Sequence, residues 1–572
     1  MTTLKNLTRG FILLTASTAF FVAPHAQGLV FFVTDTNDGV RISNLRGAIV
    51  AANRIGGNNA IILGQPFGQR RNNNEWTFRL TIPGADETNA RTGDLDITRG
   101  NLTIIGTSPN VAIDATGLGD RVFHILPHTR LMLENLIVKG GTAPLNDDGN
   151  NEYRAYGGAI FNSGTLTIQN CSIIANSSGN GGLGAIGVSQ PGGSGGGIYN
   201  EGYARLSDCI VSGNNTGNGA GPDNFGLANS GGNGAGIYNS GIIILDNCII
   251  SNNICGRGGI GGVQSEGLVP INAPGNSGGA GGCGAGIFNT SEMTLNFCAL
   301  NNNVAGDGGI GSDSGSTGGN GGAGGNGAGI FNVGILNLNT CTVSGNFCGT
   351  GGIGGSGWFG SAGTGGDGGN GGGIYNTELL NILSCTIAFN EAGAGGTGGN
   401  NNNALSPATG GQGGYGGGVL NDASETNVVM RNTLIALNMA SIGGAGGTNA
   451  DETIGNAGFN GAGFDLAGGF ASGRFNLIGM ADGSIGFTNG INADQVGSNA
   501  NPINPLLGPL QMNGGFTPTH ALLPGSPAID QGNCFGIHTD QRGHHRPHNY
   551  PSISNAVGGD GSDIGAFELD TR

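Results

Sequence analysis

The chain has 572 residues, of which 123 are glycine, and only 10% of its residues are charged. Its 21 lysines and arginines stand against 37 acidic residues, which gives a formal net charge of −16. Such a surface cannot neutralise a row of phosphates, so we expect no nucleic-acid partner, and the same sign disfavours anionic polysaccharides and membranes. Hydrophobic residues make up 37% of the chain, which is enough for a core and more than disordered chains usually contain.

The first 28 residues have the pattern of an export signal. Two cations precede an apolar run from Phe11 to Ala23, and small residues follow up to Gly28. The alternative is a short membrane anchor, but a span needs about 20 apolar residues, and no other stretch qualifies. The sequence therefore predicts a signal peptide at 1–28, no transmembrane span, and a secreted or outer-surface location.

Residues 29–152 are expected to form a cap and the first coils of the fold. Leu45, Ala48, Ile49 and Ala52 have helical spacing, so a short helix should cover the open end of the strands that follow and protect their edges. The acidic phrase "DDGNNE" at Asp147 is interpreted as a polar turn, with a weak calcium site as the alternative.

Residues 153–480 repeat a short apolar phrase such as "GGAIFNSGTLTIQNCSIIAN" seven times. Apolar residues alternate within each phrase, which predicts three short strands. One such segment cannot bury its apolar face alone, but stacked copies about 4.8 Å apart can. The predicted fold is all-β, a single-stranded right-handed parallel β-helix with glycine-rich loop insertions and an N-terminal helical cap.

Two residue types recur at fixed places and should form vertical ladders. Asparagine amides can hydrogen-bond from coil to coil at the corners, and the cysteines should be small buried side chains. Stacked cysteines point the same way, so free thiols are favoured over the disulfides that export permits, and a line of thiols does not suit zinc. The ladder residues are Asn162, Asn200, Asn239, Asn289, Asn332, Asn376, Asn421, Cys171, Cys209, Cys248, Cys298, Cys341 and Cys385.

Glycine blocks separate the phrases and leave the coils at the same place each time. Glycine-rich segments usually behave as flexible coils, so disorder is the favoured interpretation. The alternative is that the GGx triplets pack as threefold extended chains, which only glycine allows at close approach.

Residues 481–572 form a separate C-terminal region. "HTDQRGHHRPH" gathers Asp540 with four histidines, and the missing ligand spacing favours exposed loop histidines over a metal site; they are His538, His544, His545 and His548. "GGDGSDIGA" at Gly558 matches a calcium nonapeptide once, whereas such motifs bind calcium when repeated. We therefore expect no cofactor and no metal, with Ca²⁺ as a weak alternative.

Both ends resemble known modules. The phrase "LRGAIVAAN" and its flanks resemble the N-terminal part of exported bacterial β-helix proteins of the CSLREA-domain type. The phrases "NPINPLLGPLQMNGGFTPTHALLPGSPAIDQGN", "TDQRGHHRP" and "DIGAFE" resemble the choice-of-anchor Q domain, and the repeats resemble the pectin-lyase-like superfamily. The resemblance implies a β-helix exported by a bacterium and says little about activity, because this scaffold hosts enzymes and adhesins alike.

No catalytic residue is predicted. Between Gly157 and Leu420 the cations are Arg205 and Arg257 alone, and the acids sit at different offsets in the repeat, so no facing pair forms; these acids are Glu201, Asp208, Asp246, Glu292 and Glu378. The sequence favours a non-enzymatic, adhesin-like structural protein whose partner is a carbohydrate or a host or cell-surface protein. The alternative is a carbohydrate-active enzyme, a polysaccharide lyase or glycoside hydrolase.

Overall fold

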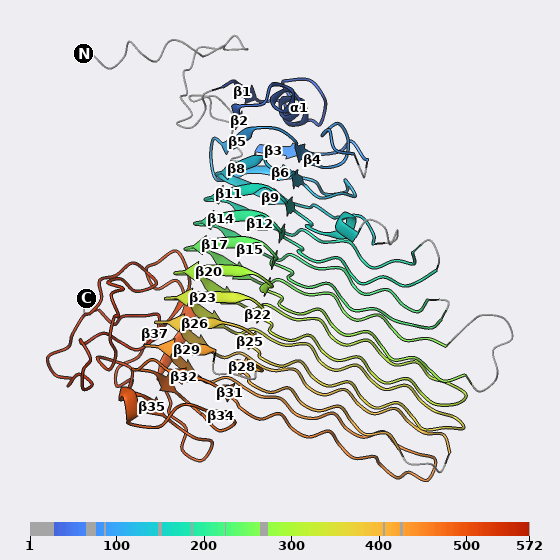
Figure 1. The fold of residues 1–572 in the computed structure, drawn as a ribbon, viewed down its shortest axis with the longest axis vertical. Coiled ribbons are helices and arrows are strands. Elements are labelled where there is room, and N and C mark those ends of the chain that lie inside the picture. The colour runs from blue at the N-terminus through green and yellow to red at the C-terminus, as the bar shows by residue number, and fades with distance from the viewer. Residues whose placement is uncertain are drawn as a thin grey trace.

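The computed structural model describes residues 28–64, 76–84, 87–146, 152–184, 187–223, 225–263, 273–403, 407–423 and 427–570. The predicted signal peptide lies outside these ranges except for its last residue, and so does most of the polar turn at 147–152. Three long parallel sheets run the length of the molecule, and successive turns of chain add one strand to each (Figure 1). The predicted parallel β-helix is confirmed.

Sheet 1 has 11 strands and contains the first strand of every repeat. In spatial order it consists of β4 (Leu95–Ile97), β7 (Phe123–Ile125), β10 (Ile160–Asn162), β13 (Ile198–Asn200), β16 (Ile237–Asn239), β19 (Ile287–Asn289), β22 (Ile330–Asn332), β25 (Ile374–Asn376), β28 (Val419–Asn421), β31 (Leu466–Gly469) and β34 (Ser484–Ile485).

Sheet 2 has 12 strands and contains the second strand of every repeat. It consists of β1 (Val30–Val33), β2 (Asn58–Leu63), β5 (Asn101–Gly106), β8 (Arg130–Glu134), β11 (Thr165–Gln169), β14 (Tyr203–Ser207), β17 (Ile242–Asp246), β20 (Glu292–Asn296), β23 (Ile335–Asn339), β26 (Leu380–Leu383), β29 (Val428–Arg431) and β32 (Ala471–Ser472).

Sheet 3 has 12 strands and contains the third strand of every repeat. It consists of β3 (Trp76–Arg79), β6 (Val111–Asp114), β9 (Leu136–Lys139), β12 (Ser172–Ile174), β15 (Ile210–Ser212), β18 (Ile249–Ser251), β21 (Ala299–Asn301), β24 (Thr342–Ser344), β27 (Thr386–Ala388), β30 (Leu434–Ala436), β33 (Leu477–Ile478) and β35 (Gln495–Val496).

The register follows the repeat. Ile160 pairs with Ile198 and Asn162 with Asn200, so equivalent residues lie directly above one another. Alternate residues point inwards and fill one continuous core along the axis of the coils. The corner between sheets 2 and 3 needs a left-handed backbone, with φ of 49° at Asn170, which asparagine tolerates better than most residues.

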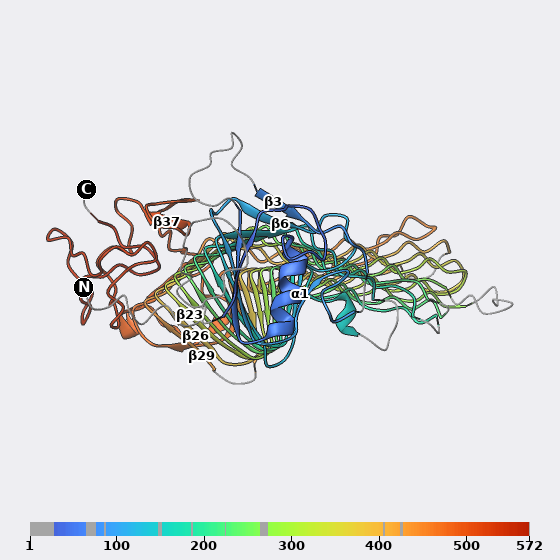
Figure 2. The same ribbon diagram turned by 90° about the horizontal axis from the view of Figure 1, so that it is seen from above.

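The predicted helical cap is confirmed as α1 (Leu45–Ile55), which lies across the N-terminal end of the coils (Figure 2). The four residues with helical spacing are buried in the central core. The helix begins after Asn44 and ends at Gly56, whose φ of 66° is a conformation that glycine adopts without strain.

The glycine-rich segments are ordered, and the prediction of disorder is wrong for their described parts. These segments, 177–194, 215–233, 254–283, 304–326, 347–370, 391–415 and 439–462, leave the coils after sheet 3 and return before sheet 1. They stack into a two-layered slab, here called the glycine array, which projects to one side of the coils (Figures 1 and 2).

Backbone hydrogen bonds in two directions hold the array together. Gly351 N–H donates to Ala394 O of the next outgoing segment (2.9 Å), and Gly352 N–H donates to Gly322 O in the other layer (2.7 Å). Burial has a period of three, with glycines inside and every third residue, such as Ile353, exposed. This is the threefold extended packing of the alternative interpretation. A Cβ at Gly352 would lie 1.9 Å from Gly309 O, so glycine is required there.

The C-terminal region folds back along the outer face of sheet 3 (Figure 1, red) and includes the hairpin β36 (Leu507–Gln511) and β37 (Thr519–Leu522). Two short 3-10 turns, η1 (Glu152–Ala155) and η2 (Ile491–Ala493), complete the elements. Ile564 and Phe567 pack on the outward side chain of Leu434, so the region belongs to the body of the protein. Among the described helices, none has the length and apolar character needed to cross a membrane.

Candidate functional site

The predicted asparagine ladder is continuous. Each side-chain amide donates to the amide oxygen of the next coil, over distances of 2.6 to 2.9 Å. From Asn200 to Asn376, the same amide nitrogen also donates to the backbone carbonyl two residues later, just before the sheet 2 strand of its own coil. Asn200, for example, donates to Gly202 O. The hydrogen-bonding groups of these buried amides are already paired within the coils, so they are not available to a ligand.

A second amide ladder runs at the corner after sheet 3. It passes from Asn176 through one asparagine per coil to Asn438, with amide distances of 2.8 to 3.0 Å. The ladder ends at Asp465, which accepts from Asn438 Nδ2 (2.9 Å), and burial raises the pKa of this carboxyl to about 6.

All ten cysteines are free, and the six ladder cysteines are buried. The thiol of Cys298 lies within 3.2 Å of Asn296 O, and its sulfur accepts a contact from Cys248 N–H at 3.4 Å. Burial raises the pKa of Cys298 well above its usual range. A thiol that stays protonated and inaccessible is a poor nucleophile and a poor metal ligand, which agrees with a packing role.

Three of the five repeat acids are tied to neighbouring coils, whereas Glu292 and Glu378 are exposed on the surface. Asp246 pairs with Arg205 at 2.7 Å, Glu201 accepts from Ser163 Oγ at 2.5 Å, and Asp208 accepts from Asn247 Nδ2 at 2.6 Å. Each of these carboxylates already has a partner along the stack. These three carboxylates are therefore engaged in contacts between coils.

An aromatic ladder, which the sequence analysis missed, covers the outside of sheet 1. The middle residue of each strand points outwards, and rings from Phe161 through Tyr199 to Tyr375 stack 4.7 to 5.1 Å apart. The signal was visible as the Phe or Tyr before six of the seven ladder asparagines, since Leu420 stands before Asn421. Because the ring faces lie against one another, their edges face outwards, and the ladder offers no open face on which a sugar could stack.

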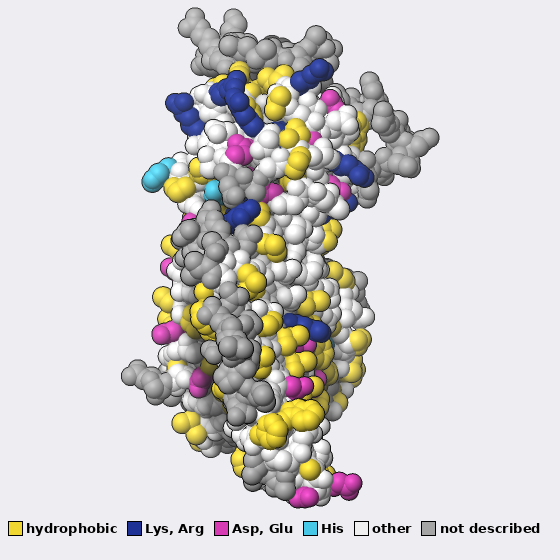
Figure 3. Space-filling model, turned by 90° about the vertical axis from the view of Figure 1, so that its right-hand side faces the viewer, with side chains coloured by type: hydrophobic (Ala, Val, Ile, Leu, Met, Phe, Trp, Pro, Cys, Tyr) yellow, Lys and Arg dark blue, Asp and Glu magenta, His cyan; other side chains and the backbone are white. Residues whose placement is uncertain are grey.

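The two faces of the glycine array differ. On the outgoing layer one row of third positions is aliphatic and exposed, with Ile260 (56% exposed), Ile310 (45%) and Ile353 (48%), while the row beside it carries Arg257, Asp307 and Thr350. On the returning layer most exposed third positions are small or polar, although the last segment exposes Phe459 (78%). The small or polar positions include Ala280, Asn320, Ala323, Thr364, Asp367, Thr409 and Gln412. Seen from the tip of the array, Lys and Arg gather at the N-terminal end while hydrophobic side chains extend along the rest (Figure 3).

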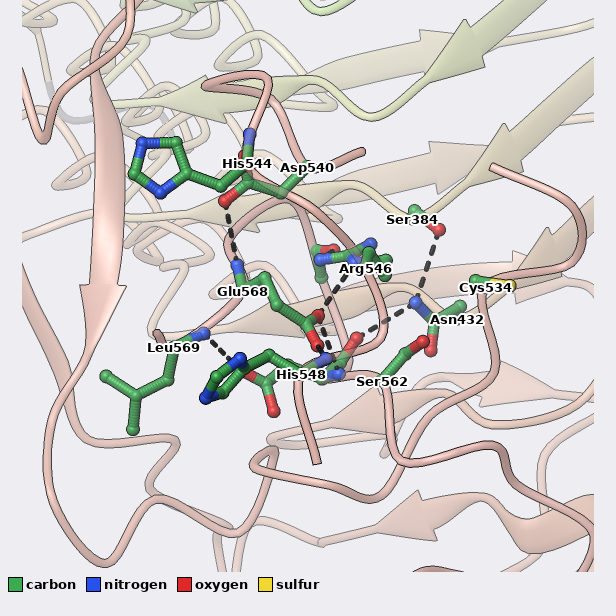
Figure 4. Close-up of polar contacts among 12 residues, drawn as sticks. Ser384, Asn432, Cys534, Asp540, His544, Arg546, His548, Ser562, Glu568 and Leu569 are labelled. Atoms are coloured by element: carbon green, nitrogen blue, oxygen red, sulfur yellow. Dashed lines mark hydrogen bonds and ion pairs between the residues drawn. The ribbon is translucent and has the colours of Figure 1, made fainter. Parts of the chain in front are cut away.

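The C-terminal histidines do not converge on a point. His538 and His545 are exposed, while His544 Nδ1 lies 2.7 Å from Asp570 Oδ2. Figure 4 shows the ring of His544 pointing away from Glu568 and His548. The part of the chain that the structure describes therefore gives these four residues no common metal position.

The carboxylates of "DIGAFE" hold the C-terminal region together instead. Glu568 forms a fully buried ion pair with Arg546 at 2.8 Å and accepts from Asp563 N–H at 3.0 Å (Figure 4). Asp563 in turn accepts from Leu569 N–H, and its carbonyl accepts from Asn432 Nδ2 at 3.0 Å. Burial and the neighbouring Glu568 raise the pKa of Asp563 to about 8. This network joins the region to sheet 3.

One group of potential metal ligands was missed by the sequence analysis. Asp94, Asp96 and His124 each place a ligand atom within 4.8 Å of the others. They lie in the first coils, ahead of the regular repeat. In the sequence, the phrase "DLD" and the later His124 were the available signal. They could not be combined without the structure, because Asp96 and His124 become neighbours only through the register of β4 and β7.

Comparison with known proteins leaves the function open. No family model matches the chain, and no curated protein matches it. Two solved structures resemble it: pectate lyase Pel9A, with 12% identity, a TM-score of 0.39 and coverage of 95% of this chain and 96% of that one, and the Escherichia coli protein YbhC, with 12% identity, a TM-score of 0.21 and coverage of 58% and 78%. At this similarity the fold class rests on the strand pairing described above.

Proposed function

We propose that the protein is exported and acts outside the cell as a non-enzymatic, adhesin-like binding protein, and that the outgoing face of the glycine array is its docking surface. The observation that carries the proposal is the ordered row of exposed aliphatic side chains at Ile260, Ile310 and Ile353. Exposed apolar side chains that cluster on one face mark interaction sites in folded proteins.

The chemistry of this face favours a protein partner over a glycan. Its third positions lie about 9 Å apart along a segment and about 4.8 Å apart between coils, which makes a flat grid. Charge is sparse there, and Arg257 lies 3.4 Å from Asp307. The cores of protein interfaces are likewise apolar and poor in charge, whereas sugar recognition needs open aromatic faces and converging polar groups.

The export signal, the CSLREA-like N-terminal part and the choice-of-anchor Q-like C-terminal region belong to the same proposal. A pectin-lyase-like enzyme is the competing function. It is disfavoured by the pairing of the repeat acids, such as Asp246 with Arg205, within the scaffold.

The experiment compares the exported chain with two triple variants in three assays. The outgoing-face variant carries Ile260→Asn, Ile310→Asn and Ile353→Asn, and the returning-face control carries Thr364→Ala, Thr409→Ala and Gln412→Ala. We expect saturable binding to one or more proteins of an immobilised panel of extracellular proteins, lost in the first variant and kept in the control. Binding only on a glycan array, or release of unsaturated or reducing sugar ends from polysaccharides, would refute the proposal.

A further inference from the structure

Two acids and a histidine lie together in sheet 1 close to the N-terminal cap, with Asp94 directly before β4, Asp96 on β4 and His124 on β7. Asp96 of β4 pairs in register with His124 of β7. Their neighbours Leu95, Ile97 and Phe123 lie in the core, so alternation turns Asp96 and His124 to the outer side of the sheet.

These two side chains lie close together without a hydrogen bond between them. His124 Nδ1 is 3.2 Å from Asp96 Oδ1. Asp96 Oδ2 accepts from Ala90 N–H at 3.0 Å, but no described donor makes a hydrogen bond of acceptable geometry to Asp96 Oδ1, although the residue is fully buried. A buried carboxylate oxygen that accepts no hydrogen bond is costly, and a cation bound between it and the nearby His124 Nδ1 is one of the arrangements that relieves the cost.

Charge at the cluster points in the same direction. The residues Asp94, Asp96 and Asp120 are each at most 6% exposed. The described ion pairs bring one guanidinium to them, since Arg121 Nε lies 3.4 Å from Asp94 and 3.8 Å from Asp120. Arg46 reaches the same loop, but it is neutralised by Asp38 at 2.8 Å. Three carboxylates and one guanidinium leave a formal charge that a divalent cation would cancel.

We propose that Asp94, Asp96 and His124 bind one divalent cation of the zinc class. Ligands 2.0–2.1 Å from a tetrahedral zinc ion lie about 3.3 Å apart, close to the 3.2 Å between His124 Nδ1 and Asp96 Oδ1. The imidazole selects zinc-class ions over calcium, which prefers six to eight oxygen ligands. The His124 side chain is 26% exposed, which gives the ion a route from solvent and a place for a water ligand.

The site would have a structural consequence. Asp94 and Asp96 end the loop that carries Ala90, and His124 belongs to the next coil. A cation shared among them would join this loop to the coil below, next to α1. Binding to the folded state would then stabilise the N-terminal end of the coil stack.

The test uses untagged exported protein, stripped with a chelator and titrated separately with Zn²⁺ and Ca²⁺ by calorimetry, with metal content measured after dialysis. We expect one Zn²⁺ per chain, and affinity at least 100-fold lower in His124→Gln and in Asp96→Asn. His544→Gln, which removes the histidine paired with Asp570, is the matched control and should bind normally. Zn²⁺ should also slow amide hydrogen exchange in residues 87–97.

Three results would overturn the proposal. They are no Zn²⁺ binding by the wild-type chain, undiminished binding by a correctly folded His124→Gln protein, and binding of Ca²⁺ without Zn²⁺. Because His124 is partly exposed, its substitution is expected to leave the fold intact, and far-UV circular dichroism checks this. Asp94→Asn provides a second variant with the same expected loss.

Discussion

Replacement of Gly352 by alanine tests whether the glycine array is a close-packed structure. The new Cβ would lie 1.9 Å from Gly309 O, whereas a carbon and a carbonyl oxygen normally stay at least about 3.3 Å apart. The segments must therefore separate by more than about 1 Å. Two hydrogen bonds join these two outgoing segments on either side of the position, Gly308 N–H to Thr350 O and Gly311 N–H to Ile353 O, both at 2.9 Å.

Separation on this scale lengthens both bonds towards the limit at which they count as hydrogen bonds. Each buried group left without a partner costs about 1–3 kcal/mol, and overpacking adds about 1–3 kcal/mol. The expected loss of local stability for Gly352→Ala is therefore about 3–9 kcal/mol. It should be concentrated in the array, because the core of the coils is not touched.

Amide hydrogen exchange, resolved by segment, measures this local free energy directly. Protection should fall in residues 349–370 and stay unchanged in sheet 2. Ile353→Ala, one position along the same segment, alters an exposed side chain and should change stability by no more than about 0.5 kcal/mol. If Gly352→Ala keeps the protection of the wild type, the close packing of the array is refuted.

Three further predictions follow from the scaffold. Asn332→Ala removes ladder bonds of 2.8 and 2.7 Å at a fully buried site and should lower the free energy of unfolding by about 2–5 kcal/mol. The control Asn337→Ala changes an outward residue and should cost less than half as much. Urea unfolding measures both costs, and equal values would contradict the role of the ladder. Buried thiols such as Cys298, whose pKa is raised by burial, should resist a thiol reagent at pH 8 until the protein is denatured, and rapid labelling of the native chain would contradict their burial. The raised pKa of Asp563, about 8 against 3.8 when unfolded, means that the folded state binds the extra proton, so its contribution to stability falls as pH rises from about 4 to about 8; Asp563→Asn should flatten this part of a melting-temperature profile, and an unchanged slope would contradict the assignment.

The coil architecture could be predicted because side chains determine each part of it: the strands, their register and the ladders between coils. The apolar alternation in "TLTIQN" identifies the strand, and the constant distance from Ile160 to Cys171 sets the register of each coil. The amide ladder follows, since asparagines at one repeat position must stack once the coils do. Helical spacing around Ile49 identified α1 for the same reason.

The glycine array could not be predicted in this way, because its specificity lies in the backbone. A GGx triplet buries no side chain, so a flexible linker and a packed slab have almost the same composition. What separates them is the alignment of triplets in successive coils, which places Gly352 between Gly309 and Gly322. That alignment follows only after the coils are in register.

The cluster at Asp96 and His124 was missed for a related reason. It joins two early coils that lack the repeat phrase, so no ladder position marked these residues as neighbours. The C-terminal network was also out of reach. Arg546 and Glu568 look like ordinary surface charges in sequence, and their burial depends on how the region packs on sheet 3.

Because backbone hydrogen bonds hold the array together, the residues that stabilise it differ from the residues that form its surface. In most folds the core is built from aliphatic side chains, so an aliphatic side chain placed on the surface does not contribute to the packing of the core. In the array the glycines make the packing contacts, so a third-position residue such as Ile310 is outside by construction. Its identity can change with little effect on stability. The outgoing layer can therefore carry the aliphatic row of Ile260, Ile310 and Ile353 at little cost in stability, which is the freedom that the proposed docking surface would need.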